Sequence, residues 1–298
     1  MWYGSDNMRG ALFMLGSMAA FTLNDACMKA LGGAVPLFQA IFLRGIAVSL
    51  FLAALAWWLG AFGPRISRRD WGLIAIRSAC EAAVAWFFIT ALFNMPIANV
   101  TAILQVLPLT VALAAWLFLA EPLGWRRLLA IVIGLAGVLL IVRPGTEGFT
   151  IYSVYALIAV ALITLREIVT RKIEGQVPSM TIALSAALAV TVFGGLGALG
   201  GVWAPLDGPT SLKLAGSVFF IMAAYVFSVM AMRIGDVSFA APFRYSGLLV
   251  ALILGALVFD EWPSGLTLLG AAIVVGTGLF TLYRERLAMR PGRPRQAR

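Results

Sequence analysis

Apolar runs of membrane-spanning length occupy almost the whole of this sequence. Hydrophobic residues make up 62% of the 298 positions and charged residues 12%, whereas soluble domains are about half apolar and a quarter charged. Each run is about 20 residues long, the length that crosses a bilayer as a helix. The runs lack the alternation of barrel strands, so we predict an all-α membrane protein with ten transmembrane helices. The expected spans are residues 8–30, 36–60, 70–92, 97–118, 124–142, 150–173, 178–202, 211–233, 238–259 and 264–283.

One stretch of the sequence occurs twice. Phe21–Pro36 contains Thr-Leu, an acid, a base and a final Val-Pro, and all of these recur in Ile163–Pro178, which starts 142 positions later. A second landmark recurs at a spacing of 140, because Glu121-Pro122 corresponds to Glu261-Trp262. Since an internal repeat determines the whole fold, we predict two five-helix units. These are residues 1–145 and 146–284, followed by a basic tail at 285–298.

The number of spans in each unit fixes how the two units are related. Five is odd, so the second unit must cross the membrane in the opposite direction to the first. The loops agree, because residues 32–36 are uncharged whereas the corresponding loop at 172–178 contains Lys172. Inverted repeats are typical of secondary transporters, in which the substrate site lies near the midplane between the repeats.

Basic residues indicate the orientation, because short cytoplasmic loops carry an excess of Lys and Arg. With the N-terminus in the cytoplasm, the opposite side keeps only Arg143, Lys213 and Lys29, and the other basic loop residues and the tail fall inside. We therefore expect a multi-pass protein of a bacterial inner membrane with both termini in the cytoplasm. The net charge of +9 is then a topology signal, and nucleic acid is not an expected partner.

The sequence offers little for chemistry other than transport. Histidine is absent, and Cys27 and Cys80 both lie inside apolar runs, so we predict no disulfide, metal site, catalytic residue or cofactor. No ATP-binding motif is present, so energy must come from a gradient or from exchange. The glycine-rich stretch at 194–201 lacks the context of a phosphate loop and is interpreted as a helix-packing surface. A membrane-embedded enzyme and a channel are the alternatives from other classes.

Charged residues inside the spans are the first functional candidates, because a charge at a helix centre costs about 2.5–3.5 kcal/mol on insertion scales. Three acid–base pairs stand four residues apart on one helix face, namely Asp25/Lys29, Arg77/Glu81 and Glu167/Arg171. Each pair either neutralises itself or takes part in binding. The depth of Asp25, beside Asn24, and of Glu81 favours function. Self-neutralisation is favoured for Glu167, which follows Arg166, because Arg171 reaches the cytoplasmic surface.

Arg244 in the ninth span has no acid on its own helix within two turns. Pro242 interrupts that helix, and an unpaired guanidinium inside the membrane must face a polar cavity or an acid from another span. The planar fork of Arg244 suits a carboxylate or phosphate of a substrate. The alternative is a structural salt bridge to Glu81 or Asp25.

The equivalent position in the first repeat is Leu104, and Gln105 there corresponds to Tyr245, which predicts a cavity of asymmetric charge. Aromatic rings near the charged residues are able to stack on a planar substrate or face a cation; packing and lipid contact are the alternatives. The predicted substrate-binding residues are Asn24, Asp25, Arg77, Glu81, Trp86, Gln105, Arg166, Glu167, Tyr225, Arg244 and Tyr245.

The sequence resembles the EamA family of drug/metabolite transporters over nearly its whole length. The resemblance rests on the ten spans in two repeats, the acid–proline joints at Glu121-Pro122 and Glu261–Pro263, and the glycines of the fifth and tenth spans. Residues 21–31 and Ala241–Tyr245 are most similar to the bacterial branch that contains S-adenosylmethionine uptake and riboflavin transporters. The resemblance implies a cavity lined by spans 1, 3, 4, 6, 8 and 9, so Arg44 on the second span is set aside.

These observations predict a monomeric secondary transporter of a small polar or zwitterionic metabolite, in which one repeat rocks against the other. Asp25 and Glu81 are expected to recognise a cation or to couple transport to protons, and Arg244 to bind an anionic group. Proton coupling, exchange and facilitated diffusion stay open. The resemblance favours import, with amino-acid export as the alternative.

Overall fold

The computed structural model describes residues 3–58, 60, 66–144, 149–234 and 237–288. These residues form helices and connecting segments without a strand, which confirms the predicted all-α class. Among the described residues, ten stretches are long and apolar enough to cross a membrane, and their ends agree with the predicted spans to within a few residues. The helices are α1 (Tyr3–Lys29), α2 (Leu37–Trp58), α3 (Arg68–Asn94), α4 (Ile97–Leu104), α5 (Leu107–Leu119), α6 (Trp125–Val142), α7 (Ile151–Thr170), α8 (Ser179–Ala198), α9 (Gly208–Arg233), α10 (Val237–Ala240), the 3-10 helix η1 (Ala241–Tyr245), α11 (Ser246–Val258) and α12 (Gly265–Ala288).

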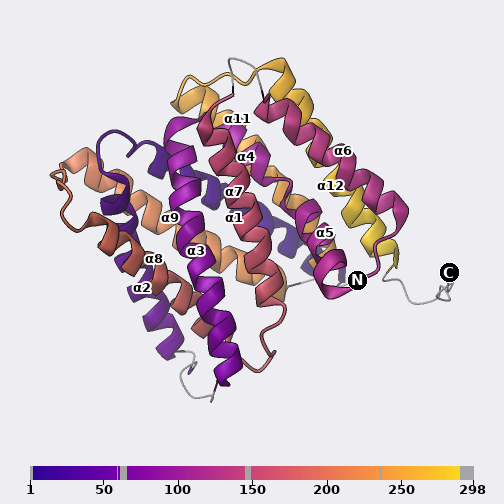
Figure 1. Cartoon of the computed structure of the whole chain (residues 1–298), viewed down its shortest axis with the longest axis horizontal. Helices are drawn as coiled ribbons and strands as arrows, with labels where there is room; N and C mark the ends of the chain where they lie inside the picture. The colour runs from indigo at the N-terminus through magenta and orange to yellow at the C-terminus, as the bar shows by residue number, and fades with distance from the viewer. Residues whose placement is uncertain (1–2, 59, 61–65, 145–148, 235–236, 289–298) are drawn as a thin grey trace.

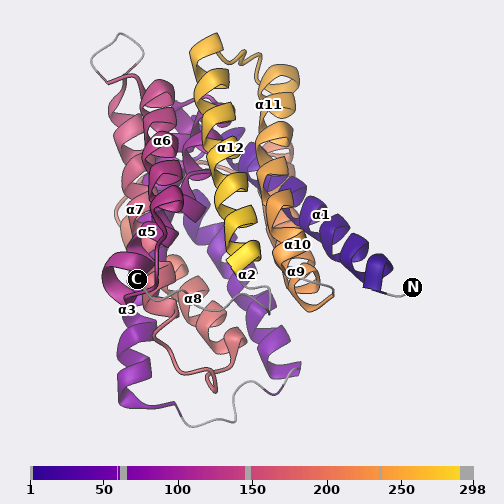
Figure 2. The same ribbon diagram turned by 90° about the vertical axis from the view of Figure 1, so that its right-hand side faces the viewer.

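The two repeats interlock in the helical bundle shown in Figure 1. The largest interfaces are those of α1 with α9, α2 with α8, α3 with α7 and α6 with α12, and each joins a helix of one repeat to a helix of the other. In addition, α11 and η1 pack against α1, α5 packs against α7, and α4 packs against both α7 and α11. We call α1, α9, α10, η1 and α11 the α1 unit, and α3, α4, α5 and α7 the α7 unit. Figure 2 shows the α1 unit on the right and the α7 unit on the left.

The inverted repeat is visible in the backbone as well as in the sequence. Ala120 after α5 has φ 54° and Asp260 after α11 has φ 53°, and both lie in the left-handed region that residues with a side chain seldom adopt. The next amide in each joint, that of Glu121 or Glu261, donates back to the carbonyl of Ala115 at 3.3 Å or of Gly255 at 2.8 Å. The two acidic joints therefore share one conformation.

Both fourth spans are interrupted at the same place. In the first repeat α4 ends at Leu104 and α5 begins at Leu107. In the second repeat the 3-10 helix η1, which contains Pro242, lies between α10 and α11, so the predicted interruption at this proline is confirmed. Proline removes a backbone donor and blocks the regular α-helical turn before it.

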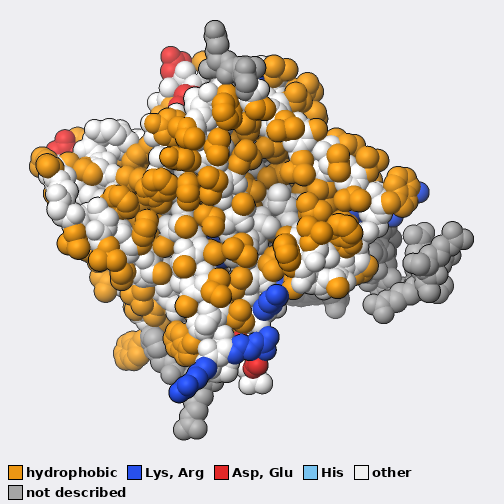
Figure 3. Space-filling model, viewed as in Figure 1, with side chains coloured by type: hydrophobic (Ala, Val, Ile, Leu, Met, Phe, Trp, Pro, Cys, Tyr) orange, Lys and Arg blue, Asp and Glu red, His pale blue; other side chains and the backbone are white. Residues whose placement is uncertain are grey.

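The ends of the bundle differ in charge. At one end, which we call the basic end, lie the exposed residues Arg68, Arg69, Arg126, Arg171, Lys172 and Arg233. Figure 3 shows basic side chains along the lower edge of the molecule, below a belt of hydrophobic ones. Here Ser67 caps α3 by accepting a hydrogen bond from the Asp70 amide at 3.0 Å, and the Asp70 carboxylate accepts from the Glu174 amide at 3.3 Å. The opposite end carries the joint between α11 and α12, and we call it the Glu261 end.

Glycines allow the closest helix contacts, as the sequence predicts for residues 194–201. A Cβ added to Gly194 would lie 2.8 Å from the backbone nitrogen of Phe42, and one added to Gly270 would lie 2.5 Å from the carbonyl oxygen of Gly137. Small residues at such crossings let helix backbones approach inside a membrane. The helix α12 runs to Ala288, past the predicted start of the tail at 285; residues 289–298 of the tail lie outside the described residues.

Candidate functional site

An ion network joins α3 to α7 in the interior of the spans. Nη1 of Arg166 donates to both carboxylate oxygens of Glu81, at 3.0 and 2.8 Å, and its Nη2 donates to Glu167 at 2.7 Å. The Arg166 side chain is 21% exposed and that of Glu81 is 22% exposed. Charge-assisted hydrogen bonds of this length are about twice as strong as neutral ones, so Arg166 is the centre of the network. The sequence predicted its three members individually but not their arrangement.

Arg77 extends the network along α3 and leaves donors unused. Its Nε donates to the hydroxyl of Thr170 at 3.1 Å, and its Nη1 lies 3.9 Å from Glu81, so the predicted pair with Glu81 is formed but loose. In the described part of the chain, Nη1 of Arg77 and Nε of Arg166 are buried without a hydrogen-bond partner. A buried donor without a partner costs about 1–3 kcal/mol. These two atoms are the unpaired donors of the network.

The other two acid–base pairs predicted from spacing are not formed. Lys29 pairs with Glu261 at 3.0 Å and not with Asp25, and Arg171 pairs with Glu121 at 2.8 Å and not with Glu167. Self-neutralisation on one helix is therefore wrong for both pairs. Four-residue spacing places two side chains on one face, but an acid from the other repeat or from a distant joint competes for the base. Asp25 instead accepts a hydrogen bond from Asn24, and Glu167 accepts one from Arg166.

A second group of polar residues lies on α1, α2 and α9. Asn24 is buried, and its amide donates to Asp25 at 2.9 Å. Arg44 of α2 interacts electrostatically with Tyr225, Asp25 and Glu81. The sequence analysis set Arg44 aside because it lies on the second span. Its interactions depend instead on the face of α2 that it occupies. Arg44 therefore joins the candidate site.

Aromatic side chains of α3 and α7 lie farther from the basic end than the network does. Trp86 lies 4.7 Å from Phe87 and 5.4 Å from Tyr155 of α7, measured between ring centroids. Tyr155 was missed in the sequence because α7 shows no cluster of aromatic and charged residues near it. Tyr225 contacts Phe21 edge-on at 5.7 Å and also interacts electrostatically with Glu81 and the nearby arginines.

The predicted residues of the interrupted helices lie apart from the ion network. Tyr245 is buried, with its ring beside Gly278 of α12, and its carbonyl accepts a hydrogen bond from Gln105 at 3.4 Å. Arg244 is exposed and has no ion pair among the described residues. The alternative salt bridge from Arg244 to Glu81 or Asp25 is wrong, because Arg166 occupies Glu81 and Asp25 is bonded to Asn24. Its role in binding an anionic group stays a prediction.

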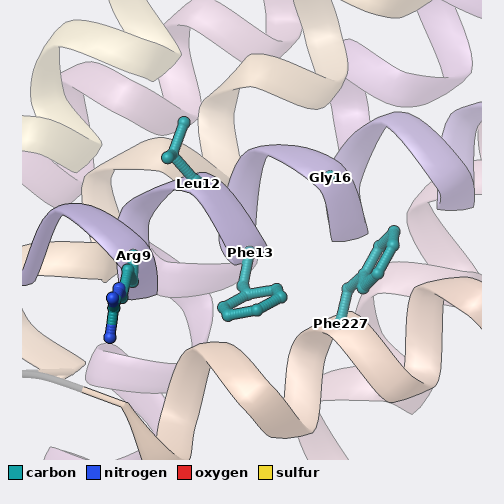
Figure 4. Close-up of a pocket in the computed structure, with 5 residues that line it drawn as sticks. All are labelled: Arg9, Leu12, Phe13, Gly16 and Phe227. Carbon is teal, nitrogen blue, oxygen red and sulfur yellow. The ribbon is translucent and has the colours of Figure 1, made fainter. Parts of the chain in front are cut away.

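A groove of about 340 Å³ lies elsewhere, between α1 and α9 near the basic end. It is lined by Arg9, Leu12, Phe13, Gly16 and Phe227, and Figure 4 shows the two phenylalanine rings projecting between the facing helices. None of the predicted binding residues contributes to it, so we place the candidate site at the ion network. Within the described ranges, no cluster of three or more acidic or cysteine side chains is arranged to hold a metal ion.

Comparisons with known proteins point to one family. The profile of the EamA-like transporter family matches residues 8–143. The chain is 30% identical to a riboflavin transporter of Brucella anthropi over 75% of this chain and 81% of that protein. It is 25% identical to an S-adenosylmethionine uptake transporter of Rickettsia bellii, over 94% and 95%. It is also 22% identical to the pseudopaline exporter CntI of Pseudomonas aeruginosa, over 88% and 92%. A solved crystal structure shares the fold with a TM-score of 0.64 at 19% identity, over 93% and 98% of the two chains.

Proposed function

Because the chain belongs to the EamA-like transporter family, we propose that it is a secondary transporter of a small zwitterionic metabolite. The observation that carries this proposal is the network around Arg166, which holds both signs of charge inside the membrane and has two unused guanidinium donors. Ionisable groups at such depth are expensive and are usually part of a substrate or ion pathway. A passive structural role would use paired charges with no donor left over.

The side chains around the network suit a ligand with three features. The unused donors of Arg77 and Arg166 fit a carboxylate, and the carboxylates of Asp25 and Glu167 fit an ammonium or sulfonium group. The rings of Trp86 and Tyr155 fit a planar heterocycle or a cation. S-adenosylmethionine has all three features, whereas riboflavin has the heterocycle and no amino-acid group. We therefore rank an S-adenosylmethionine-like substrate first and a riboflavin-like substrate second.

Transport would proceed by alternating access between the two ends of the bundle. Since the largest interfaces join helices of different repeats, we propose that the bodies that move are the α1 unit and the α7 unit, not the two repeats. Asp25, deep in α1, is the candidate for proton coupling. We place the basic end and both termini in the cytoplasm of a bacterial inner-membrane protein that acts as a monomer.

Export is the second candidate, because one relative is named as an exporter. The direction of net transport depends on the gradients that drive it as well as on the site. We favour uptake, since the relatives named above with the higher identities are a riboflavin transporter and an S-adenosylmethionine uptake transporter.

The test is a thermal-shift screen of the purified protein with S-adenosylmethionine, riboflavin, amino acids and polyamines, followed by counterflow in proteoliposomes. A ligand at a hundred times its Kd raises the unfolding free energy by about 2.7 kcal/mol. The expected result is stabilisation and counterflow with S-adenosylmethionine, both abolished by Arg166→Gln and retained by Lys172→Gln at the exposed basic end. Counterflow that survives Arg166→Gln would refute the proposed site, and no counterflow with any of these compounds would refute the substrate class.

A further inference from the structure

Two ion pairs cross between the repeats in equivalent ways. Lys29 at the end of α1 pairs with Glu261, and Arg171 at the end of α7 pairs with Glu121. Lys29 corresponds to Arg171 in the repeat, and Glu121 corresponds to Glu261. In each pair, the base of one repeat therefore meets the acid of the other. One pair lies at the Glu261 end and the other at the basic end, since the joint between α11 and α12 and the joint between α5 and α6 lie at opposite ends of the bundle (Figure 1).

The pair at the Glu261 end holds a joint of the opposite unit. Nζ of Lys29 donates to the carbonyl oxygens of Leu92 at 3.2 Å and Met95 at 2.6 Å, at the end of α3. The second carboxylate oxygen of Glu261 accepts from the amide of Ile97 at 2.9 Å, at the start of α4. Lys29 is the last residue of α1, and Glu261 lies in the joint that follows α11, so both are attached to the α1 unit. The three backbone groups that they bind belong to the α7 unit. The pair therefore links the two units.

The charges of Lys29 and Glu261 are complementary to the two helix ends that they contact. The last carbonyls of a helix and its first amides have no partners within the helix, and the macrodipole favours a cation at the former and an anion at the latter. The ammonium of Lys29 meets the end of α3, and the carboxylate of Glu261 meets the start of α4 on the other side of Pro96. The side chains of Lys29 and Glu261 are only 8% and 21% exposed. Separating the units here would leave an ammonium, a carboxylate and three backbone groups to find new partners.

The equivalent pair at the basic end is not engaged in this way. The side chains of Arg171 and Glu121 are 46% and 53% exposed. The two side chains share a 2.8 Å hydrogen bond. In the part of the chain that the structure describes, neither side chain bonds to the backbone of the α1 unit. The backbone carbonyl that corresponds to that of Leu92 is that of Met232, in the last turn of α9. The two equivalent ion pairs therefore differ: Lys29–Glu261 binds the backbone of the opposite unit, and, among the described residues, Arg171–Glu121 does not.

We propose that the two pairs are alternating clasps that close opposite ends of the transporter. In this structure the Lys29–Glu261 clasp holds the joint between α3 and α4, so the Glu261 end is closed and the basic end is open. In the other state the Arg171–Glu121 pair binds the last turn of α9, and Lys29 and Glu261 release α3 and α4. This inference rests on the alternating access of the proposed function, but it needs no knowledge of the substrate.

The test measures the two ends separately by double electron–electron resonance in a Cys27→Ser/Cys80→Ser background. Nitroxide labels at Ile151 and Leu257 report the Glu261 end, and labels at Met8 and Phe118 report the basic end; all four side chains are exposed. Glu261→Gln keeps the shape and an acceptor oxygen but removes the charge that holds Lys29. We expect the ratio of open to closed molecules at the Glu261 end to rise about tenfold, the order expected for losing a hydrogen bond between charged groups. The distance at the basic end shortens in the same molecules.

Two further variants make the result specific. Asp260→Asn removes a charge from the same joint at a residue that bonds to Trp262 and not to Lys29, so it should leave both distance distributions unchanged. Adding Glu121→Gln to Glu261→Gln weakens the opposite clasp and should return the ratio towards that of the unmodified protein. Distributions unchanged by Glu261→Gln, or changed equally by Asp260→Asn, would overturn the proposal. A shift without transport of any compound would support the clasps and refute only the proposed function.

Discussion

The side-chain amide of Gln105 donates to the backbone carbonyl of Tyr245 at 3.4 Å, and these two residues occupy the same position in the two repeats. Equivalent positions of an inverted repeat meet only near the axis that relates the repeats. The interruptions of the fourth and ninth spans therefore meet close to that axis. Interrupted helices are a recurrent feature of transporter binding sites, but here the interruptions lie apart from the ion network around Arg166.

Replacing Arg166 should affect both stability and transport. Arg166→Gln leaves the carboxylates of Glu81 and Glu167 without their main partner, and breaking a buried ion pair from one side costs about 3 kcal/mol. We expect a clear fall in the thermal unfolding temperature in detergent and loss of transport.

The matched control for this variant is Arg171→Gln. It breaks an ion pair that is about half exposed, and such pairs contribute at most about 1 kcal/mol. Equal thermal destabilisation by the two variants would show that the network around Arg166 is not a buried structural unit.

Arg244→Ala separates binding from folding. Arg244 is exposed and forms no ion pair within the described residues, so its removal should leave the thermal unfolding temperature and the membrane expression unchanged. If Arg244 binds an anionic group of the substrate in one state of the cycle, transport in proteoliposomes should be abolished. Normal transport by Arg244→Ala would exclude it as a substrate anchor.

Asp25→Asn tests proton coupling. The amide keeps a hydrogen-bond partner for Asn24 but does not take up a proton in the accessible pH range. We expect transport to persist while its rate no longer responds to an imposed pH gradient across the vesicle membrane. An unchanged response to the gradient would remove Asp25 from the coupling role and favour exchange or facilitated diffusion.

Gly270→Ala should weaken the contact of α6 with α12. The added methyl group would lie 2.5 Å from the carbonyl oxygen of Gly137, so the helices must separate, and overpacking of this kind costs about 1–3 kcal/mol. Gly276→Ala on the same helix is the control, since nothing lies within 4 Å of its added Cβ. We expect a lower unfolding temperature for the first variant alone. Equal unfolding temperatures for both variants would mean that this crossing is not tightly packed.

The spans, the duplicated unit and its inversion were all predictable from the sequence. Each depends on a property that is local or that repeats along the chain. An apolar run of about 20 residues must cross the bilayer whatever it packs against, and an odd number of crossings inverts the second copy. Pro242 likewise interrupts its helix through its own ring.

The partners of the charged residues were decided by the tertiary structure. Four-residue spacing predicted that Lys29 pairs with Asp25 and Arg171 with Glu167. In the structure, Lys29 pairs with Glu261 and Arg171 with Glu121. Spacing along one helix shows which side chains share a face, and it carries no information about what the neighbouring helix presents to that face. A buried charge takes the partner that best replaces water. For Lys29, that partner is an acid 232 positions away together with the end of another helix, which only the packed bundle brings within reach.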